Sequence, residues 1–199
     1  MTLLEQTSTE AIQAARSPVL KTRRLLLRAP VPDDAEALTA LINDRRIAEN
    51  TARIPHPYTL KDAEAFIASA ASGGEVAFVV TLADGPIIGG CGIATLRADG
   101  PEIGYWFGVA HWGHGYATEA ARAVIDHAFR DIGLKELRAG ARVSNPASRR
   151  VLEKCGFQWT GVVLQRVRAL NSSAPSDRFR LDRRLWASLR NWGKVRRIA

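Results

Sequence analysis

Two glycines, Gly113 and Gly115, follow an apolar and aromatic run over 102–109 and precede a helix-forming stretch at 117–130. Glycine lets the backbone turn sharply and approach a ligand closely, because no side chain stands in the way. The first N–H groups of a helix have no partner within the helix, and the helix dipole places partial positive charge at the same end. A strand, a glycine turn and a helix start in this order predict a site for phosphate or pyrophosphate.

Two common phosphate-binding loops do not fit this stretch. A P-loop needs Lys and then Ser or Thr after its last glycine, whereas Tyr116 follows Gly115. A dinucleotide-binding loop needs a third glycine at the place where this chain has Thr118. An ordinary tight turn between a strand and a helix is the alternative to a binding loop.

A second stretch, residues 143–157, has helix signals at both ends. Asn145 suits the N-cap, and Pro146 suits the first helical position because proline lacks the N–H that would be unpaired there. Gly156 suits the C-terminal cap. The stretch predicts a short helix with Asn145 and Ser148 on one face, since they are three residues apart.

Together these stretches resemble the GNAT family of N-acetyltransferases. Residues 112–117, Trp-Gly-His-Gly-Tyr-Ala, resemble the family's acyl-CoA-binding loop, although Trp112 stands where most members have Gln or Arg. This Trp and the flanking residues resemble the corresponding motif of one subgroup, the ribosomal-protein alanine acetyltransferases. The 143–157 stretch resembles the family's helix beside the pantetheine arm of the cofactor. The resemblance covers roughly residues 22–185.

The resemblance implies that an amine attacks the thioester of acetyl-CoA directly, in a ternary complex. The ammonium must lose a proton, the tetrahedral oxyanion needs donors, and the thiolate must leave. By position, Glu102 matches the base proposed in similar enzymes, acting through water, and Ser148 matches the serine proposed to protonate the sulfur. The alternative for Glu102 is a carboxylate in a turn that makes a surface ion pair. The alternative for Ser148 is a helix hydroxyl that hydrogen-bonds to the nearby backbone.

The resemblance also implies the residues that bind acetyl-CoA. Phe107 matches the strand residue whose main chain holds the pantetheine amides. Arg122, Arg149 and Arg150 are candidates for the CoA phosphates, with solvated helix charges as the alternative. The expected cofactor-binding residues are Phe107, Gly113, His114, Gly115, Tyr116, Ala117, Thr118, Asn145 and Arg150.

His111 and His114 invite a metal interpretation because they are three residues apart. They lie in a loop, however, with no cysteine or paired carboxylate at ligand spacing. We therefore expect no metal cofactor.

Size and composition favour one globular domain. The chain has 199 residues, which we divide into a poorly ordered extension over 1–19 and a single N-acetyltransferase domain over 20–199. It has only two cysteines, Cys91 and Cys155, which favours reduced thiols and a cytoplasmic location. It has no signal-peptide pattern and no apolar run of membrane-spanning length, so we expect no membrane partner. A monomer or a homodimer fits equally well.

Charge is concentrated near the C-terminus. Residues 177–199 hold eight basic and two acidic side chains, which account for six of the chain's eight net positive charges. Such a segment can contact a ribosome or nucleic acid, but a solvated surface is the more common outcome. The alternation over 178–182 predicts a half-exposed strand.

The order of elements predicts an α+β fold with a mixed, mostly antiparallel sheet of about seven strands. Strands are expected over 25–28, 76–81, 87–94, 102–109, 137–141, 157–167 and 179–184. Helices are expected from 33 with Ala37, Leu38, Leu41 and Ile42 on the apolar face, over 59–71, over 117–130 and after Asn145. The resemblance implies that the strands flanking helix 117–130 splay apart and admit the acyl-CoA arm.

The predicted function is transfer of an acetyl group from acetyl-CoA to a primary amine. Subgroup resemblance and the basic segment favour a protein N-terminus as acceptor, with a small-molecule amine as the alternative. Residues 161–175 depart from the subgroup's usual pattern in the region that borders the acceptor. The alternative from a different class of function is a non-catalytic module that binds CoA or associates with the ribosome and uses the same loop.

Overall fold

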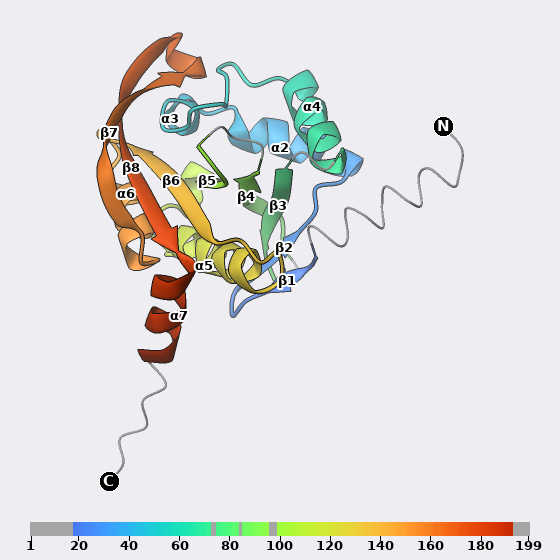
Figure 1. Cartoon of the computed structure of the whole chain (residues 1–199). Coiled ribbons are helices and arrows are strands. Elements are labelled where there is room, and N and C mark those ends of the chain that lie inside the picture. The colour runs from blue at the N-terminus through green and yellow to red at the C-terminus, as the bar shows by residue number, and fades with distance from the viewer. Residues whose placement is uncertain (1–17, 73–74, 84, 96–98, 193–199) are drawn as a thin grey trace.

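The computed structural model describes residues 18–72, 75–83, 85–95 and 99–192. Within these ranges the chain forms one sheet with helices on both faces (Figure 1). Residues 1–17 of the expected N-terminal extension, and the basic residues beyond 192, lie outside the described ranges, so those expectations stay predictions. No helix of the described part is both long and apolar enough to cross a membrane.

Eight strands form the sheet: β1 (Leu20–Lys21), β2 (Leu25–Arg28), β3 (Glu75–Leu82), β4 (Ile87–Ala94), β5 (Glu102–Phe107), β6 (Glu136–Arg142), β7 (Gln158–Val167) and β8 (Ser172–Asp182). Their order is β1-β2-β3-β4-β5-β6-β8-β7, and only the β5–β6 pair is parallel among them. The α+β class and the mostly antiparallel sheet are confirmed. The strand beyond the expected seven is β1, which pairs with β2.

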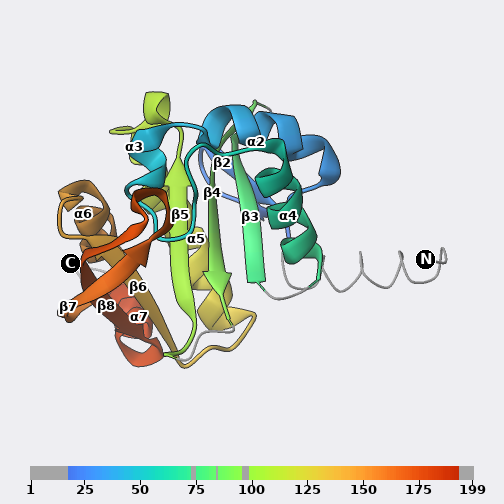
Figure 2. The same ribbon diagram turned by 90° about the horizontal axis from the view of Figure 1, so that it is seen from above.

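The helices are α2 (Ala35–Ile42), α3 (Arg45–Ala48), α4 (Leu60–Ala71), α5 (Tyr116–Arg130), α6 (Pro146–Lys154) and α7 (Arg183–Trp192), with 3-10 turns η1 (Pro32–Asp34), η2 (Val109–His111) and η3 (Arg168–Leu170). Figure 2 shows α2 and α4 on one face of the sheet and α5 on the other. The sheet is therefore the middle of three layers.

Alternate residues of β3 pack against opposite helical layers, because successive side chains of a strand point to opposite faces. Val76, Phe78 and Val80 belong to the larger core, which α5 covers. Val79 belongs to a smaller core with Leu38 of α2. Burial on both faces explains why this strand is almost continuously apolar.

Strands β5 and β6 part soon after they meet. Their parallel register has two residue pairs, Glu102 with Arg138 and Ile103 with Ala139. Beyond this point β5 continues beside β4 as far as Phe107, whereas β6 continues beside β8 (Figure 2). The splay expected from the family resemblance is present.

The C-terminal part of the sheet differs from the prediction in two ways. β8 begins at Ser172, well before the expected start at 179, and pairs with β7 along a long hairpin. Arg183 and Arg184 were expected in this strand but begin α7. The cause is Asp182, whose carboxylate accepts the backbone N–H of Leu185 at 2.9 Å and so caps the helix.

Three smaller expectations were also wrong. The strand expected to reach 109 ends at Phe107, and η2 follows. α3 was not predicted; Asp44 starts it by accepting the N–H of Arg46 at 2.8 Å. In α2, Ala37 is exposed and Leu41 only half-buried, because Ala35, Leu38 and Ile42 face the sheet.

A buried carboxylate, Asp34, fixes the turn between β2 and α2. Arg28 donates two hydrogen bonds to it, at 2.7 and 2.8 Å, and the N–H of Val31 donates a third at 2.8 Å. Burial by itself raises the pKa of Asp34, but the bonds from Arg28 and Val31 outweigh it, so the pKa lies below its usual value. The ionised form therefore stabilises the fold.

We predict that Asp34→Asn lowers the free energy of unfolding by about 1–3 kcal/mol at pH 7, the cost of leaving charged donors without a matched acceptor. Because the folded-state pKa is lowered, this stabilisation is present above the unfolded pKa of about 4 and is lost as pH falls through the folded value. Urea denaturation at pH 7 and pH 3 measures both effects. Exposed Asp33→Asn is the control, and equal losses for the two variants would contradict the account.

Candidate functional site

The loop between β5 and α5 lines a cavity of about 420 Å³ in the gap between β5 and α6. We call it the loop cavity. Every residue expected to bind the cofactor except His114 lines this cavity, and so does Ser148. The side chain of Phe107 is buried in the core, so the strand contributes its main chain.

The two loop glycines have backbone angles that other residues rarely adopt. Gly113 has φ +80° and Gly115 has φ +79°, both in the left-handed region. A Cβ at Gly113 would meet no protein atom within 4 Å, so the backbone angle and not crowding requires glycine there. Gly115 is the N-cap of α5 and supplies no side-chain cap, which leaves the first N–H groups of a 15-residue helix for a ligand.

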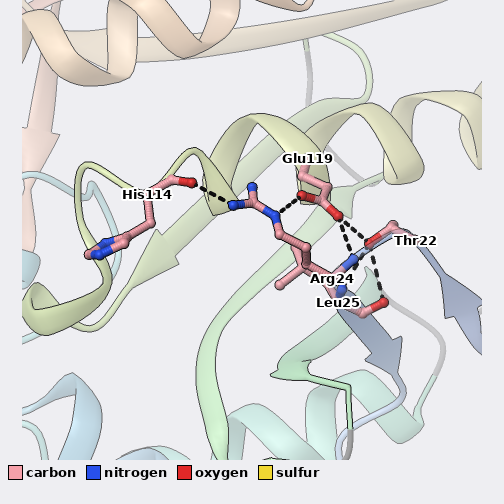
Figure 3. A network of polar contacts seen from close by, with 5 residues as sticks. All are labelled: Thr22, Arg24, Leu25, His114 and Glu119. Carbon is pink, nitrogen blue, oxygen red and sulfur yellow. Dashed lines mark hydrogen bonds and ion pairs between the residues drawn. The ribbon is translucent and has the colours of Figure 1, made fainter.

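A partly buried network anchors this loop to the N-terminal strands (Figure 3). Glu119, in the first turn of α5, accepts hydrogen bonds from Thr22 Oγ1 at 2.7 Å and from Arg24 N and Nε at 2.9 and 2.7 Å. Arg24 also donates to the carbonyl of His114 at 3.0 Å, and its guanidinium lies 4.6 Å from the centroid of the Tyr116 ring. The network joins residues far apart in sequence, and sequence reasoning missed it.

The network also sets the charge of Glu119. Burial raises the pKa of Glu119, but the hydrogen bonds from Thr22 and Arg24 outweigh it and hold the pKa below its usual value. Glu119 is therefore an anion that holds Arg24, and Arg24 holds the loop. His114 packs against this network: its ring stacks on the ring of Tyr116, with the centroids 5.6 Å apart.

Ser148 stands where the loop cavity meets a second one. This second cavity, the strand cavity, has a volume of about 180 Å³ and shares Asn50, Tyr105, Trp106 and Ser148 with the first. Asn145 caps α6 by accepting the N–H of Ser148 at 3.1 Å. The hydroxyl of Tyr105 lies 2.9 Å from Ser148 Oγ and 3.1 Å from its carbonyl oxygen.

Tyr105 is a site residue whose role the sequence did not show. Burial raises its pKa well above the usual value, against the lowering effect of the hydrogen bond to Ser148. The phenol therefore keeps its proton and can hold the Ser148 hydroxyl in place. Tyr105 and its neighbour Trp106 alternate along β5, and both residues line both cavities.

Glu102, at the start of β5, lies in the wall of the strand cavity. Arg178 of β8 faces it with two contacts of 3.3 Å, and about one-seventh of each side chain is exposed. Glu102 is thus part of a half-enclosed ion pair, more buried than the surface pair considered from sequence. Its carboxylate and Ser148 line the same cavity.

The three arginines considered for phosphate contacts have different surroundings. Arg122 donates to the carbonyl of Lys154 at 2.7 Å, and Arg149 pairs with Glu153 and Asp177. Arg150 lines the loop cavity. Among the described residues no group of three metal-ligating side chains forms, around His111 or elsewhere.

Trp112 and Asn50 are further lining residues that sequence reasoning left out. The indole N–H of Trp112 donates to the carbonyl of Phe107 at 2.7 Å and so ties the loop to the end of β5. The sequence feature that could have indicated this role of Trp112 is its place in the loop motif, where most members of the family have Gln or Arg. Asn50 follows α3 and lines both cavities, and nothing in its local sequence indicated this.

The comparisons with known proteins agree with this geometry. Residues 24–158 match the family described as "Acetyltransferase (GNAT) domain", and the chain belongs to that family. A Bacillus subtilis protein named uncharacterized N-acetyltransferase YoaA is 31% identical over 156 residues, which cover 74% of this chain and 87% of YoaA. The ribosomal-protein-serine acetyltransferase of Escherichia coli is 36% identical over 64 residues, 32% of this chain and 36% of that protein.

Solved structures show the same fold. Spermidine N-acetyltransferase from Vibrio cholerae, in complex with CoA and spermine, superposes with a TM-score of 0.72 at 21% identity, covering 83% of this chain and 99% of that one. The matches to two further Bacillus subtilis relatives span only 48% and 36% of those proteins. The resemblance inferred from residues 112–120 and 143–157 is thus confirmed at the level of the family.

We predict that Glu119→Gln speeds amide hydrogen exchange across residues 112–121 by about tenfold, equivalent to about 1.4 kcal/mol of lost local stability. The neutral amide cannot hold the guanidinium of Arg24, so the carbonyl of His114 loses its donor. Hydrogen exchange read by mass spectrometry measures the effect without any ligand. Glu153→Gln, which breaks an exposed ion pair on α6, is the control. Unchanged exchange in Glu119→Gln would mean that the glycines alone define the loop.

Proposed function

We propose that the protein is an acetyl-CoA-dependent N-acetyltransferase that acts on a primary amine in a ternary complex. The observation that carries the proposal is the junction of the two cavities at Ser148 and Tyr105. On one side lies a glycine loop suited to pyrophosphate, and on the other lies a pocket whose wall holds Glu102. Acetyl-CoA is the donor of the GNAT family.

The chain offers acetyl-CoA a site along the gap between β5 and α6. The N–H groups at the start of α5 and the loop around Gly113 and Gly115 receive the pyrophosphate, with Arg150 on the same cavity wall. The main chain of β5 near Phe107 holds the pantetheine amides, because β5 has parted from β6 there. This arrangement brings the thioester to the junction near Ser148.

The amine enters through the strand cavity. Glu102 takes the proton of the ammonium through a water molecule, and the amine nitrogen attacks the thioester carbonyl carbon. Arg178 keeps the carboxylate of Glu102 in place, at the 3.3 Å contacts described above. The C–N bond forms and the C–S bond breaks. The nitrogen loses two protons: the first passes to Glu102 and then to solvent before the attack, and the second passes to solvent as the tetrahedral intermediate collapses to the amide.

Ser148 protonates the leaving thiolate. Tyr105 holds the serine hydroxyl by their contact of 2.9 Å, and the Asn145 cap holds the backbone of Ser148. The serine alkoxide would be a poor final state, so it regains a proton from solvent as CoA leaves. The products are the acetylated amine and CoA thiol.

We favour a protein N-terminus as the acceptor because the loop is similar to the ribosomal-protein acetyltransferase subgroup. A relative named for acetylation of a ribosomal-protein serine supports this choice. The alternative is a small-molecule amine, which is supported by the spermine bound to a structural neighbour. A non-catalytic CoA-binding or ribosome-associated module is the alternative from another class.

Part of the basic segment that suggested a ribosome contact is engaged within the fold. Arg178 pairs with Glu102, Arg180 pairs with Glu136 at 2.9 Å, and Arg190 lies 3.8 Å from Asp126. These charges have internal partners, so they contribute less to a surface for nucleic acid. We therefore rank the enzyme above the binding module.

We predict that Glu102→Gln lowers kcat about 100-fold and Ser148→Ala lowers it about tenfold, because proton transfers of this kind contribute factors of that order. The KM for acetyl-CoA should change less than about twofold, since neither side chain binds the cofactor. CoA release, followed with a thiol reagent and a panel of peptides and small amines, measures the effect.

Glu136→Gln is the matched control, because it also removes a carboxylate from an Arg pair on the same sheet. It should leave kcat unchanged. Wild-type rates in both Glu102→Gln and Ser148→Ala would rule out the assigned roles. Acetyl-CoA binding with no turnover of any amine would favour the non-catalytic module.

A further inference from the structure

The strand cavity adjoins a groove rich in arginine. We call this the arginine groove. It lies against the β7–β8 hairpin and shares Ala52, Arg53 and Gln165 with the strand cavity. The strand cavity shares a different set, including Ser148, with the loop cavity. The strand cavity therefore adjoins the loop cavity at the reacting junction and adjoins the arginine groove through different residues.

Charge differs between the strand cavity and the groove. The wall of the strand cavity holds two carboxylates, Glu75 and Glu102, and two guanidinium groups, Arg53 and Arg142. The groove is lined by one carboxylate, Asp99, and four guanidinium groups, Arg53, Arg166, Arg168 and Arg178. The charge is thus balanced in the strand cavity and basic in the groove.

The acidic partners of the groove arginines lie outside the groove lining. Arg178 and Arg53 pair with Glu102 and Glu75, both of which line the strand cavity. Arg168 lies 3.7 Å from Asp62, at the start of α4. These carboxylates offset the positive charge of the arginines, but they do not line the groove, whereas the guanidinium groups do.

Arg166 has a neutral partner. It donates to the side-chain oxygen of Asn171 at 2.6 Å, and it is exposed. An exposed guanidinium keeps several N–H donors for a carboxylate or phosphate. Arg166 and Arg168, on β7 and η3, are therefore the cations of the groove best placed to meet a ligand.

We propose that the acceptor is an amine joined to an anionic group, with the amine at Glu102 and the carboxylate or phosphate in the arginine groove. This inference rests on the proposed function. A peptide with acidic residues after its N-terminus and a small phosphorylated amine share this chemistry. A polyamine does not fit, because its second and third ammonium groups would lie beside the exposed guanidinium groups of Arg166 and Arg168.

The first test compares acceptors that differ mainly in charge. Ala-Gly-Asp-Asp-amide, Ala-Gly-Asn-Asn-amide and Ala-Gly-Lys-Lys-amide share the same N-terminal amine, whose acetylation is followed by mass spectrometry so that the lysine side-chain amines do not contribute. In the same way, 2-aminoethyl phosphate is compared with 2-aminoethanol. Spermidine is the polyamine. We expect kcat/KM to rise by about fivefold from the Asn to the Asp peptide at low salt and to fall for the Lys peptide, with the difference shrinking in 0.5 M salt.

The Arg166→Gln, Arg168→Gln double variant should abolish the preference for the anionic member of each pair. Arg184→Gln, an exposed arginine of α7 outside the groove lining, is the control and should keep it. If only the phosphate pair responds, the acceptor is a small molecule; if only the peptides respond, it is a protein N-terminus. Preference for spermidine or the Lys peptide, or a preference unchanged in the double variant, overturns the proposal.

Binding separates this inference from the proposed function. Isothermal titration of CoA-saturated protein with the same compounds needs no turnover. Tighter binding of an anionic probe than its matched neutral one, lost in the double variant, supports the groove even if no amine is acetylated. Equal or reversed affinities overturn it whether or not the enzyme turns over.

Discussion

The parting of β5 and β6 is the constraint on which the rest of the structure depends. A parallel pair that continued past Ile103 and Ala139 would fill the space that the site occupies. Because the pair stops there, β5 carries the glycine loop and α5 away from β6, while β6 carries α6 and the β7–β8 hairpin. The loop cavity and the strand cavity both lie in the resulting gap, and Ser148 lines both of them.

Local signals in the sequence predicted much of this arrangement. Glycine at 113 and 115 indicated a turn before a helix, and Asn145 with Pro146 indicated a capped helix, because caps and turns depend on adjacent residues. Short apolar runs located β3 and β4, whose residues are buried almost throughout. The resemblance to a family supplied the splay, which no local pattern encodes.

What the sequence did not reveal depends on contacts between distant residues. Arg24 reaches Glu119 across 95 positions and Arg178 reaches Glu102 across 76, and only the folded sheet brings them together. The first two residues of α7, Arg183 and Arg184, were assigned to a strand because Asp182 looked like one more polar position of that strand, and the rest of α7 was not predicted. The change from balanced charge in the strand cavity to four arginines around the groove likewise follows from tertiary structure.

The central claim is that the loop at Gly113 holds the phosphates of acetyl-CoA. Gly113 and Gly133 have nearly the same φ, +80° and +79°, and a Cβ at either meets no protein atom within 4 Å. Alanine at each position should cost about 1 kcal/mol in stability. In isothermal titration with acetyl-CoA, we predict wild-type affinity for Gly133→Ala and about tenfold weaker binding for Gly113→Ala. Equal affinity of the two variants, or no binding by the wild-type protein, would contradict the account.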